Sequence, residues 1–390
     1  MTEKDMEMFR RTVICPLCFE KVNVSDIGFK CDLPTCRSSV EFFRVKSKIP
    51  LLEKLGVVSA PKRMRHTCGE MTTTRICPNC RSEIPIDIED LIDFRIAIVG
   101  APAAGKSIYV TMLINWIRSM AAELGWTWTL TALNEDTINQ CEAFYRQLFQ
   151  RHEELYASRP ICDTYRHSPL VYVLRLGKGM ASKRIMLTFL DVPGENLFNQ
   201  AFLPHVSRYI CNASGIICIV DPLQIFGVRK MVAAKYGEDA LPMPDIYDSG
   251  IIIRNVVDVI MANTHCGKKI KIPLAVSFSK MEAIKGIVDN GVDISQRILD
   301  KTRHCGVFNE SEFADIDGMM RSWIEKLDDA AGIIGQSESF AHKGFFGFSA
   351  IGPDTRFTNG HLGQDPRSIR VEDPFLWLLH LRGFVKSVKG

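Results

Sequence analysis

A short glycine-bounded segment, GAPAAGKS at residues 100–107, follows directly on an apolar run in this chain. That run, FRIAIVG at 94–100, is continuously apolar, which is typical of a parallel strand covered on both faces. Beyond the segment, apolar residues recur over 106–124 about every 3.6 positions, which predicts an amphipathic helix. The segment matches G-x-x-x-x-G-K-S and lies between a strand and a helix N-terminus, so it predicts a phosphate-binding loop.

Each part of such a loop has a chemical role. Backbone N–H groups and the positive end of the helix meet the phosphates, Lys106 reaches the β and γ oxygens, and the Ser107 hydroxyl binds Mg²⁺. We expect Lys106 to be exposed before a ligand arrives. A chance glycine loop with a surface lysine is the alternative, which the strand–loop–helix context disfavours. The predicted nucleotide-binding residues of this segment are Gly100, Ala103, Ala104, Gly105, Lys106, Ser107 and Ile108.

The rest of the C-terminal region alternates between strand and helix patterns. Strands are predicted at 170–176, 185–190, 215–220, 272–277 and 345–349, and helices at 135–157 and 311–331. Residues 222–250 and 352–372 are rich in turn residues and are predicted as excursions from the sheet. The alternation predicts an α/β fold with a mostly parallel sheet and helices on both faces.

One predicted strand ends in a second chemical motif. Residues 185–190 run into DVPGE at 191–195, which places Asp191 at a strand's C-terminal end, where it can hold the Mg²⁺ shell. Gly194 could offer its N–H to the γ-phosphate. An Asp-Pro-Gly run is also common in simple turns, and its place downstream of the phosphate loop favours the functional interpretation. The predicted magnesium ligands are Ser107 and Asp191.

The N-terminal region has a different composition. Of the 13 cysteines in the 390 residues, seven lie before residue 81, two pairs of them as Cys-x-x-Cys, and no export signal precedes them. Metal is therefore favoured over disulfides, and the cytosol is the expected compartment. We expect a tandem zinc-ribbon region at 1–90, followed at 91–390 by a P-loop domain with insertions.

The spacing suggests two zinc sites. Cys15, Cys18, Cys31 and Cys36 are predicted to form one four-thiolate site, and Cys77 and Cys80 a second with Cys68 and His66. His66 is the weaker assignment, because His66-x-Cys68 is tighter than a normal knuckle and a stray histidine is the alternative. Four thiolates leave no open position for water, so we expect zinc to be structural.

Charge and hydropathy limit the partners. The net charge of +3 does not by itself imply nucleic acid or a membrane, and no apolar stretch is long enough to span a bilayer. Residues 37–65 hold eight Lys or Arg against two acids. Such a patch suits nucleic acid, but we favour a solvated ribbon surface that docks a protein partner.

The order of these motifs resembles a known family. G-x-x-x-x-G-K-S, D-x-x-G at 191–194, a lysine-bearing strand end and a late Ser-Ala resemble TRAFAC-class P-loop GTPases over residues 94 to about 350. The ribbons, LDVPGE at 190–195 and RVEDPFLWLL at 370–379 are similar to bacterial double-GTPase-type domains associated with conflict systems. The resemblance implies a GTP-binding, Mg²⁺-dependent, GTP-hydrolysing switch whose ribbons dock a partner.

Base recognition departs from the family pattern. In SFSKME at 277–282, Ser279 and Glu282 replace the Asn and Asp of N-K-x-D. The resemblance implies that Glu282 accepts from guanine N1 and N2 while the stem of Lys280 packs on the base. It also implies that Ser349 and Ala350 contact the O6 side of guanine. An ATP-using enzyme remains an alternative.

Catalysis departs from the pattern as well. Glu195 stands where related enzymes often carry a water-orienting glutamine, which suggests slow or partner-dependent turnover. Thr164 is the predicted switch threonine, with a solvated loop threonine as the alternative. The predicted catalytic set is Lys106, Asp191, Gly194 and Glu195. A zinc-ribbon scaffold whose nucleotide site scarcely turns over is the third interpretation.

Overall fold

The computed structural model describes residues 12–33, 36, 41–42, 61–155, 168–179, 182–191, 203–238, 241, 246–265, 267–289, 292–355, 357–358 and 360–389. The chain divides into two compact units. The first consists of residues 1–93 with 184–186, and the second of 94–183 with 187–390. Within the described residues, none of the helices has both the length and the apolar character needed to cross a membrane.

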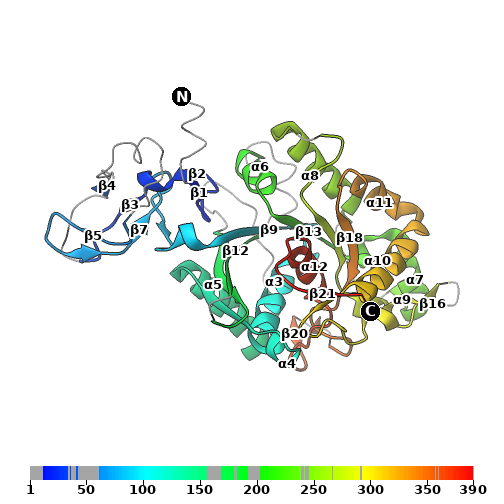
Figure 1. The fold of residues 1–390 in the computed structure, drawn as a ribbon. Helices are drawn as coiled ribbons and strands as arrows, with labels where there is room; N and C mark the ends of the chain where they lie inside the picture. The colour runs from blue at the N-terminus through cyan, green and yellow to red at the C-terminus, as the bar shows by residue number, and fades with distance from the viewer. Residues whose placement is uncertain are drawn as a thin grey trace. The chain divides into compact units, whose positions relative to one another are not determined.

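The second unit is built on a seven-stranded sheet with the order β10-β11-β12-β9-β13-β14-β18 (Figure 1). β13 runs parallel to β9 and β14, and β14 runs parallel to β18, whereas β10 pairs antiparallel with β11 at one edge. This confirms the predicted α/β class with a mostly parallel sheet. The strands are β9 (Ile92–Gly100), β10 (Trp128–Ala132), β11 (Leu170–Leu176), β12 (Lys183–Asp191), β13 (Gly215–Val220), β14 (Leu274–Phe278) and β18 (Lys343–Gly347).

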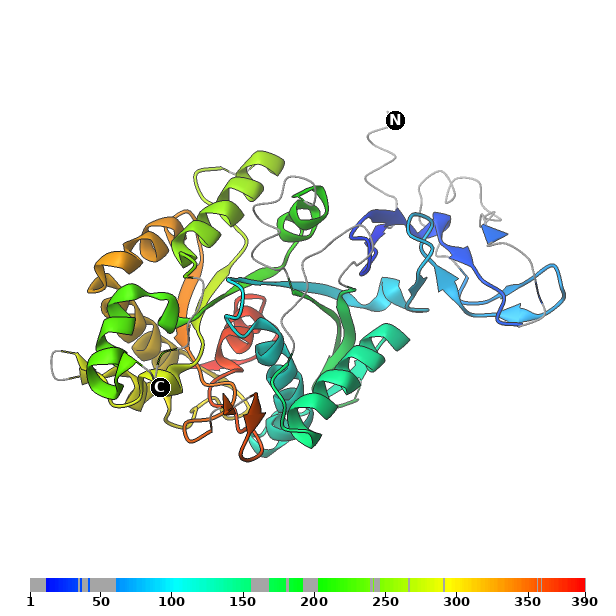
Figure 2. The same cartoon turned by 180° about the vertical axis from the view of Figure 1, so that it is seen from behind.

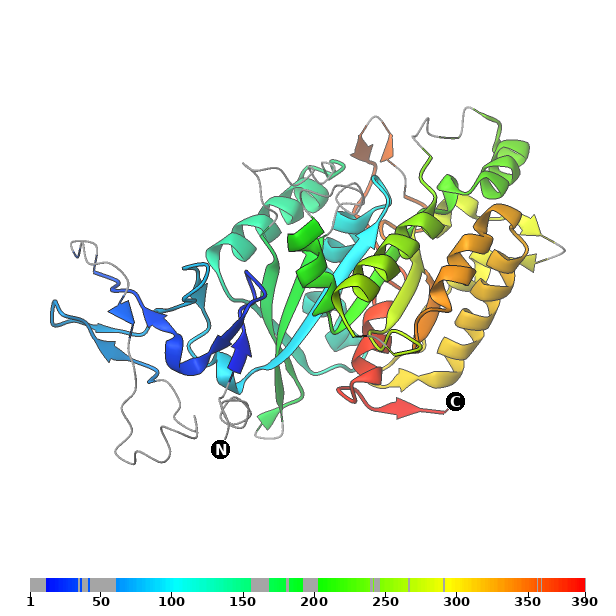
Figure 3. The ribbon, with the colours of Figure 1, turned by 90° about the horizontal axis from the view of Figure 1, so that it is seen from above.

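Helices cover both faces of this sheet, with α3 and α12 on one side and α6 and α8 on the other (Figures 1, 2 and 3). This two-sided cover explains why the central strands are continuous apolar runs, since Ile98, Ile217 and Val276 are fully buried. The helices are α3 (Lys106–Asn115), α4 (Ala121–Glu123), α5 (Glu135–Tyr145), α6 (Leu203–Cys211), α7 (Phe226–Tyr236), α8 (Ser249–Asn263), α9 (Ile294–Ile298), α10 (Glu310–Glu325), α11 (Ala331–Ser337) and α12 (Asp373–Leu381).

Some elements differ from their predicted bounds. The helix predicted over 106–124 is present, with a π-helical turn at Trp116–Met120 between α3 and α4. The helix predicted over 135–157 ends earlier, with a π-helical turn at Arg146–Gln150. The predicted excursion at 222–250 contains α7, whose thin buried stripe of Val228 and Val232 gave a weak periodic signal.

Short strands complete both units. In the second unit they pair as β15 (Val288–Asp289) with β16 (Val292–Asp293), β17 (Phe308–Asn309) with β21 (Ser387–Val388), and β19 (Phe357–Thr358) with β20 (His361–Leu362). In the first unit, β1 (Thr12–Ile14) pairs with β2 (Lys21–Asn23), and β5 (Met64–Arg65) with β6 (Met71–Thr72). A four-stranded sheet there has the order β4 (Glu41–Phe42), β3 (Gly28–Phe29), β7 (Arg75–Ile76), β8 (Glu83–Ile84).

The first unit has a small apolar core, in which Val22, Ile27, Phe29 and Ile76 are buried among short strands. A buried Arg75–Glu89 ion pair lies beside them, with Nη2 2.6 Å from Oε1. Cores of this size rarely hold a fold alone, so the unit needs a further cross-link.

Candidate phosphate loop and cysteine clusters

The segment 100–107 joins the end of β9 to the start of α3. At Gly100 a Cβ would lie 2.5 Å from the carbonyl oxygen of Ile219 on neighbouring β13, so only glycine fits at this position. Ala103 and Gly105 have φ values of +57° and +92°, which turn the backbone sharply before the helix begins. The result is a curled loop at the N-terminus of α3.

The backbone carbonyls from Gly100 to Ala104 all accept hydrogen bonds from side chains. Gln224 Nε2 donates to the carbonyl of Pro102 over 3.1 Å. Ser279 and Lys280, which follow β14, donate to the next two carbonyls. These two bonds and those of Lys106 run from Lys280 Nζ to Ala103 (3.0 Å), from Ser279 Oγ to Ala104 (2.8 Å), and from Lys106 Nζ to Gly100 (3.2 Å) and Ala101 (2.9 Å).

Holding the carbonyls in this way leaves the amide groups of the loop for an anion. The backbone N–H groups of Ala103, Gly105 and Lys106 donate no hydrogen bond to another residue in the part of the chain that the structure describes. Unsatisfied N–H groups on a curled loop at a helix N-terminus form a binding site for phosphate.

Lys106 differs from its predicted state. We expected an exposed side chain, but Lys106 is only 6% exposed, and its ammonium group donates to two carbonyls of its own loop. A buried ammonium needs such partners, and the carbonyls are the nearest acceptors in the loop. If Lys106 binds phosphate as predicted, its ammonium group would have to exchange these carbonyls for phosphate oxygens.

Asp221, which follows β13, is a residue of this site that the sequence motifs did not single out. Its Oδ2 lies 2.6 Å from Lys280 Nζ, and its Oδ1 accepts from the N–H of Leu223 over 2.9 Å. The second bond caps the 3-10 turn Pro222–Gln224, which places Gln224 against Pro102. The signal that could have revealed it is an apolar run that ends in Asp-Pro, GIICIVDP at 215–222.

Two predicted base-recognition residues lie together. Glu282, after β14, is 6% exposed, and Ser349, after the neighbouring strand β18, hydrogen bonds to it. Burial raises the pKa of Glu282 to about 7, opposed by the bond from Ser349. Glu282 Oε2 has no hydrogen-bond partner among the described residues. Ala350 follows Ser349 in the loop after β18.

The remaining predicted site residues lie in the first turn of α3, at the end of β12 or outside the described residues. Ser107 and Ile108 lie in the first turn of α3. Asp191 is the last residue of β12, and its side chain lies outside the described part of the structure. Thr164, Gly194 and Glu195 also lie outside the described residues, so their roles stay predictions.

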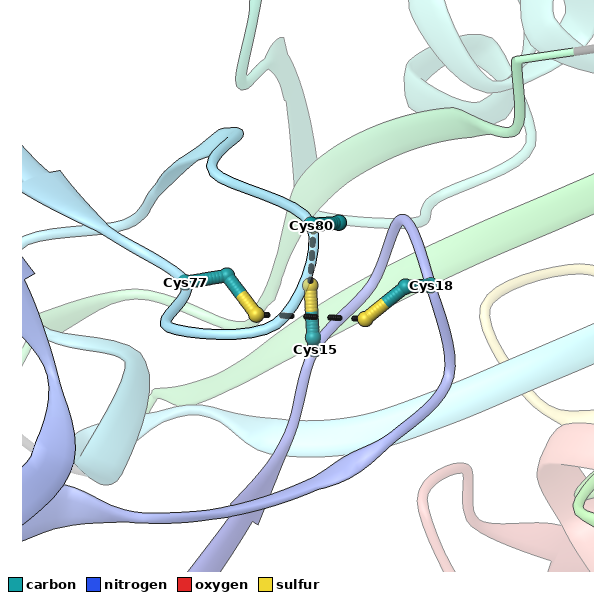
Figure 4. Close-up of side chains that lie close together, drawn as sticks. All are labelled: Cys15, Cys18, Cys77 and Cys80. Carbon is teal, nitrogen blue, oxygen red and sulfur yellow. Dashed lines mark hydrogen bonds between the residues drawn. The ribbon is translucent and has the colours of Figure 1, made fainter.

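Four cysteines of the first unit converge on one point (Figure 4). The Sγ atoms of Cys15 and Cys80 lie 3.8 Å apart, as do those of Cys18 and Cys77. Four sulfurs at about 2.3 Å from a tetrahedral zinc ion are about 3.8 Å from one another, so the spacing fits this metal. Hydrogen bonds from Cys15 and then Cys18 lower the pKa of the Cys80 thiol far below its usual range, which favours a thiolate there.

The second group consists of Cys31, Cys36, His66 and Cys68. Cys31 Sγ is 3.6 Å from Cys68 Sγ, and Cys36 Sγ is 3.6 Å from His66 Nδ1. The His66–Cys68 turn is a shortened knuckle, in which Gly69 at φ +94° donates back to the carbonyl of His66. The structure thus brings His66 to a group of thiols that could hold a metal ion.

The predicted partition of the eight ligands was wrong. Cys15 and Cys18 do not join Cys31 and Cys36 but face Cys77 and Cys80. The reason is the antiparallel pairing of β3 with β7, which brings the chain back beside itself at Ile76. The ligands between β3 and β7 in the sequence, from Cys31 to Cys68, lie close to one another. The Cys-x-x-Cys turns of β1–β2 and β7–β8 lie outside this stretch, and the pairing of β3 with β7 brings these two turns together.

Comparisons with known proteins give one relative and distant structural likenesses. No protein-family model matches the chain. SaeC of Mycolicibacterium smegmatis, provisionally named an ESX-1 scaffolding and assembly protein, is 24% identical over 217 residues, which are 55% of this chain and 52% of SaeC. The chain therefore spans about half the length of the curated relative that it matches.

Solved structures align only weakly. The small GTPase Arl6 (BBS3) of Trypanosoma brucei with bound GppNp is 12% identical, with a TM-score of 0.28 over 75% of this chain and 98% of its own. Bacterial selenocysteine-specific elongation factor EF-Sec is 13% identical, with a TM-score of 0.28 over 75% of this chain and 29% of its own. Sup35 in complex with GDP is 10% identical, with a TM-score of 0.25 over 67% of this chain and 38% of its own.

Proposed function

We propose that this chain binds GTP with Mg²⁺ at residues 100–107 and hydrolyses it. The observation that carries the proposal is the set of tethered carbonyls. Every carbonyl from Gly100 to Ala104 accepts a side-chain hydrogen bond, and the N–H groups of Ala103, Gly105 and Lys106 are left for phosphate. A loop preorganised in this way binds an oxyanion with little reorganisation. The triphosphate is the ligand whose chemistry suits a lysine and a helix N-terminus together.

Guanine is supported by the environment of Glu282. The carboxylate is buried with one oxygen unpartnered among the described residues, and Lys280 connects the same segment to the phosphate loop. Guanine presents two N–H donors to such a carboxylate, whereas adenine presents an acceptor at N1. Loss of a charged hydrogen-bonded pair costs about 1.5–3 kcal/mol, so GTP is favoured over ATP by about ten- to hundredfold.

The metal and catalytic roles extend the same proposal. Ser107 and Asp191 would hold Mg²⁺, which neutralises charge on the β and γ oxygens when it is bound. Gly194 would donate its N–H to the γ-phosphate, and Glu195 would orient water. An ionised Glu195 repels the γ-phosphate, so we propose slow or partner-stimulated turnover.

The cysteine clusters support a second part of the proposal. We infer that each cluster holds one zinc ion, which supplies the cross-link that the small core of the first unit needs. The sulfur spacings of 3.6 Å and 3.8 Å fit that ion. Protein docking through this unit, in a bacterial conflict system, is the role that the family resemblance supports.

A scaffold is the second candidate function, favoured by the name of the relative SaeC. In this version the nucleotide stabilises one state of the chain and is scarcely hydrolysed. The contacts of Lys106 are compatible with a scaffold, because its bonds to two carbonyls of its own loop hold the shape of the loop without a ligand.

One experiment separates these functions. Affinities for GTP, ATP and inosine triphosphate are measured side by side, and phosphate release is followed under saturating nucleotide. We expect GTP to bind best and inosine triphosphate, which lacks the 2-amino group, to fall between the two. Equal affinities would remove guanine from the proposal, and phosphate release no faster than in a Lys106→Ala control would favour the scaffold.

A further inference from the structure

The two cysteine clusters differ in their access to solvent. In the buried cluster, defined as Cys15, Cys18, Cys77 and Cys80, Cys15 is 1% exposed and Cys77 is 0% exposed, while Cys18 and Cys80 are half-buried and none of the four is exposed. In the exposed cluster, defined as Cys31, Cys36, His66 and Cys68, Cys68 is exposed and Cys31 is half-buried. A dissolved oxidant can therefore reach sulfur in the exposed cluster without any opening of the fold.

Hydrogen bonds reinforce this difference. In the buried cluster, Cys15 accepts from the backbone of Leu17 and Cys18, and Cys80 accepts from Ser82. Such bonds withdraw charge from a thiolate and reduce its reactivity. In the exposed cluster, Cys31 accepts one such bond, from the backbone of Leu33 in an exposed segment.

The charge of the two clusters has the opposite effect on the reactivity of their sulfurs. Four thiolates around a divalent ion carry one more negative charge than three thiolates and a neutral histidine, which makes the buried sulfurs intrinsically better nucleophiles. Access decides between the two effects, because attack on a peroxide requires direct contact of sulfur with oxygen. A sulfur that is shielded by its own fold reacts only when the fold opens.

We propose that the exposed cluster is an oxidation site, at which a hydroperoxide joins Cys31 to Cys68 and releases the zinc held there. The Sγ atoms of these residues lie 3.6 Å apart, and a disulfide brings them to about 2.0 Å. The inference rests on the proposed zinc binding and adds a chemistry that the nucleotide site does not need.

The reaction balances with hydrogen peroxide as the oxidant. One thiolate attacks a peroxide oxygen, the O–O bond breaks, and the leaving hydroxide takes a proton to become water. The sulfenic acid formed is attacked by the second thiolate, so that the S–S bond forms, the S–O bond breaks and a second water leaves after protonation. Two sulfurs together lose two electrons, the peroxide gains two, and zinc stays divalent.

The structural consequence is local. The disulfide removes two of the four ligands, and Cys36 with His66 alone does not complete a tetrahedral site. The hairpin β5–β6 remains hydrogen bonded to the residue that follows β3, because Thr72 Oγ1 donates to the carbonyl of Lys30 over 2.5 Å. Oxidation should therefore empty the exposed cluster while the rest of the unit stays folded.

The test uses the full chain after its zinc content has been measured by elemental analysis. Hydrogen peroxide is added to the folded protein with a chromophoric zinc chelator, and cysteines are mapped by differential alkylation and mass spectrometry. We expect two zinc ions per chain at the start. One is released in a fast phase together with the Cys31–Cys68 disulfide, and the other is released at least about tenfold more slowly.

Two variants make the result specific. Cys68→Ser removes the disulfide partner, so zinc content should fall to about one per chain and the fast phase should vanish while the slow phase persists. Cys305→Ser removes an exposed cysteine that lies outside both clusters, and both phases should remain. If Cys305→Ser abolishes the fast phase instead, exposure alone and not the cluster explains the reactivity.

The outcomes distinguish this inference from the proposed zinc binding. A chain that carries two zinc ions but oxidises both clusters at the same rate, or the buried cluster first, overturns the oxidation site alone. A chain that carries no zinc before oxidant is added overturns the zinc proposal as well.

Discussion

The buried carboxyl of Glu282 makes the proposed preference for guanine dependent on pH. Only the ionised form can accept from both guanine donors, and burial raises the pKa of this group to about 7. Acidification should therefore weaken GTP binding, because protons and guanine compete for the same carboxylate. ATP binding should not share this dependence, because adenine offers no pair of donors.

The magnitude follows from the titration. With a pKa of about 7, the group is ionised in about 90% of molecules at pH 8 and in about 10% at pH 6. GTP affinity should then fall about tenfold between these values relative to ATP, or about 1.4 kcal/mol. The ratio of the two affinities is the relevant quantity, because the triphosphates themselves titrate near pH 6 and affect both ligands equally.

The assay is equilibrium binding of GTP and ATP from pH 6 to pH 8 at constant ionic strength, on the native chain and on Glu282→Gln. The amide keeps the size of the side chain but has no charge to titrate, so its GTP-to-ATP ratio should be small and flat. A native ratio that does not change across the range would refute the assignment of Glu282 to the base site. A ratio that changes equally in Glu282→Gln would assign the titration to another group.

Folding stability supplies an independent check on the same group. Because the pKa rises from 4.5 to about 7 on folding, the folded state holds the proton more tightly than the unfolded state. Stability without nucleotide should therefore fall as the pH rises from about 4.5 to about 7, by at most about 3.4 kcal/mol. Thermal unfolding of Glu282→Gln should lack this part of the slope, whereas the part from buried Glu372, whose pKa rises to about 8, should remain.

Four further results are expected. Lys106→Ala should lower GTP affinity about ten- to hundredfold in isothermal titration while circular dichroism stays native, and unchanged affinity would exclude a phosphate contact. Asp221→Asn keeps the cap on Leu223 but weakens the ion pair with Lys280, so GTP affinity should fall about three- to tenfold, whereas Asp293→Asn at a comparable cap on α9 should not change it. Arg370→Met removes the nearest cationic partner of the buried carboxylates of Glu312 and Asp373 and should cost about 3–5 kcal/mol in denaturant unfolding, so a loss under 1 kcal/mol would contradict the ion-pair network. A zinc chelator should increase hydrogen exchange within 12–33 and 61–90 before it affects the seven-stranded sheet, and equal exchange in both would contradict structural zinc.

The sequence by itself determined the features that depend on neighbouring residues. Continuous apolar runs identified strands such as Gly215–Val220, because burial on both faces excludes polar positions. The helix after the phosphate loop followed from its period of about 3.6 residues. GAPAAGKS located the loop itself, because its glycine positions and strand–helix context are local properties.

Contacts between distant residues were decided by the tertiary structure. Gln224 and Lys280 reach Pro102 and Ala103 only because β9, β13 and β14 are adjacent and parallel, so their C-terminal ends lie at one edge of the sheet. Lys106 is buried against two carbonyls of its own loop, which could not be inferred from a motif that describes the bound state.

The cysteine clusters show the same division. The Cys-x-x-Cys spacing identified the knuckles, because a tight turn is required to aim two thiolates at one ion. Which knuckles share an ion depends on the pairing of β3 with β7, which joins residues more than forty positions apart. The spacing of cysteines along the chain does not predict that pairing, because any two knuckles could share an ion before the register of the strands between them is fixed.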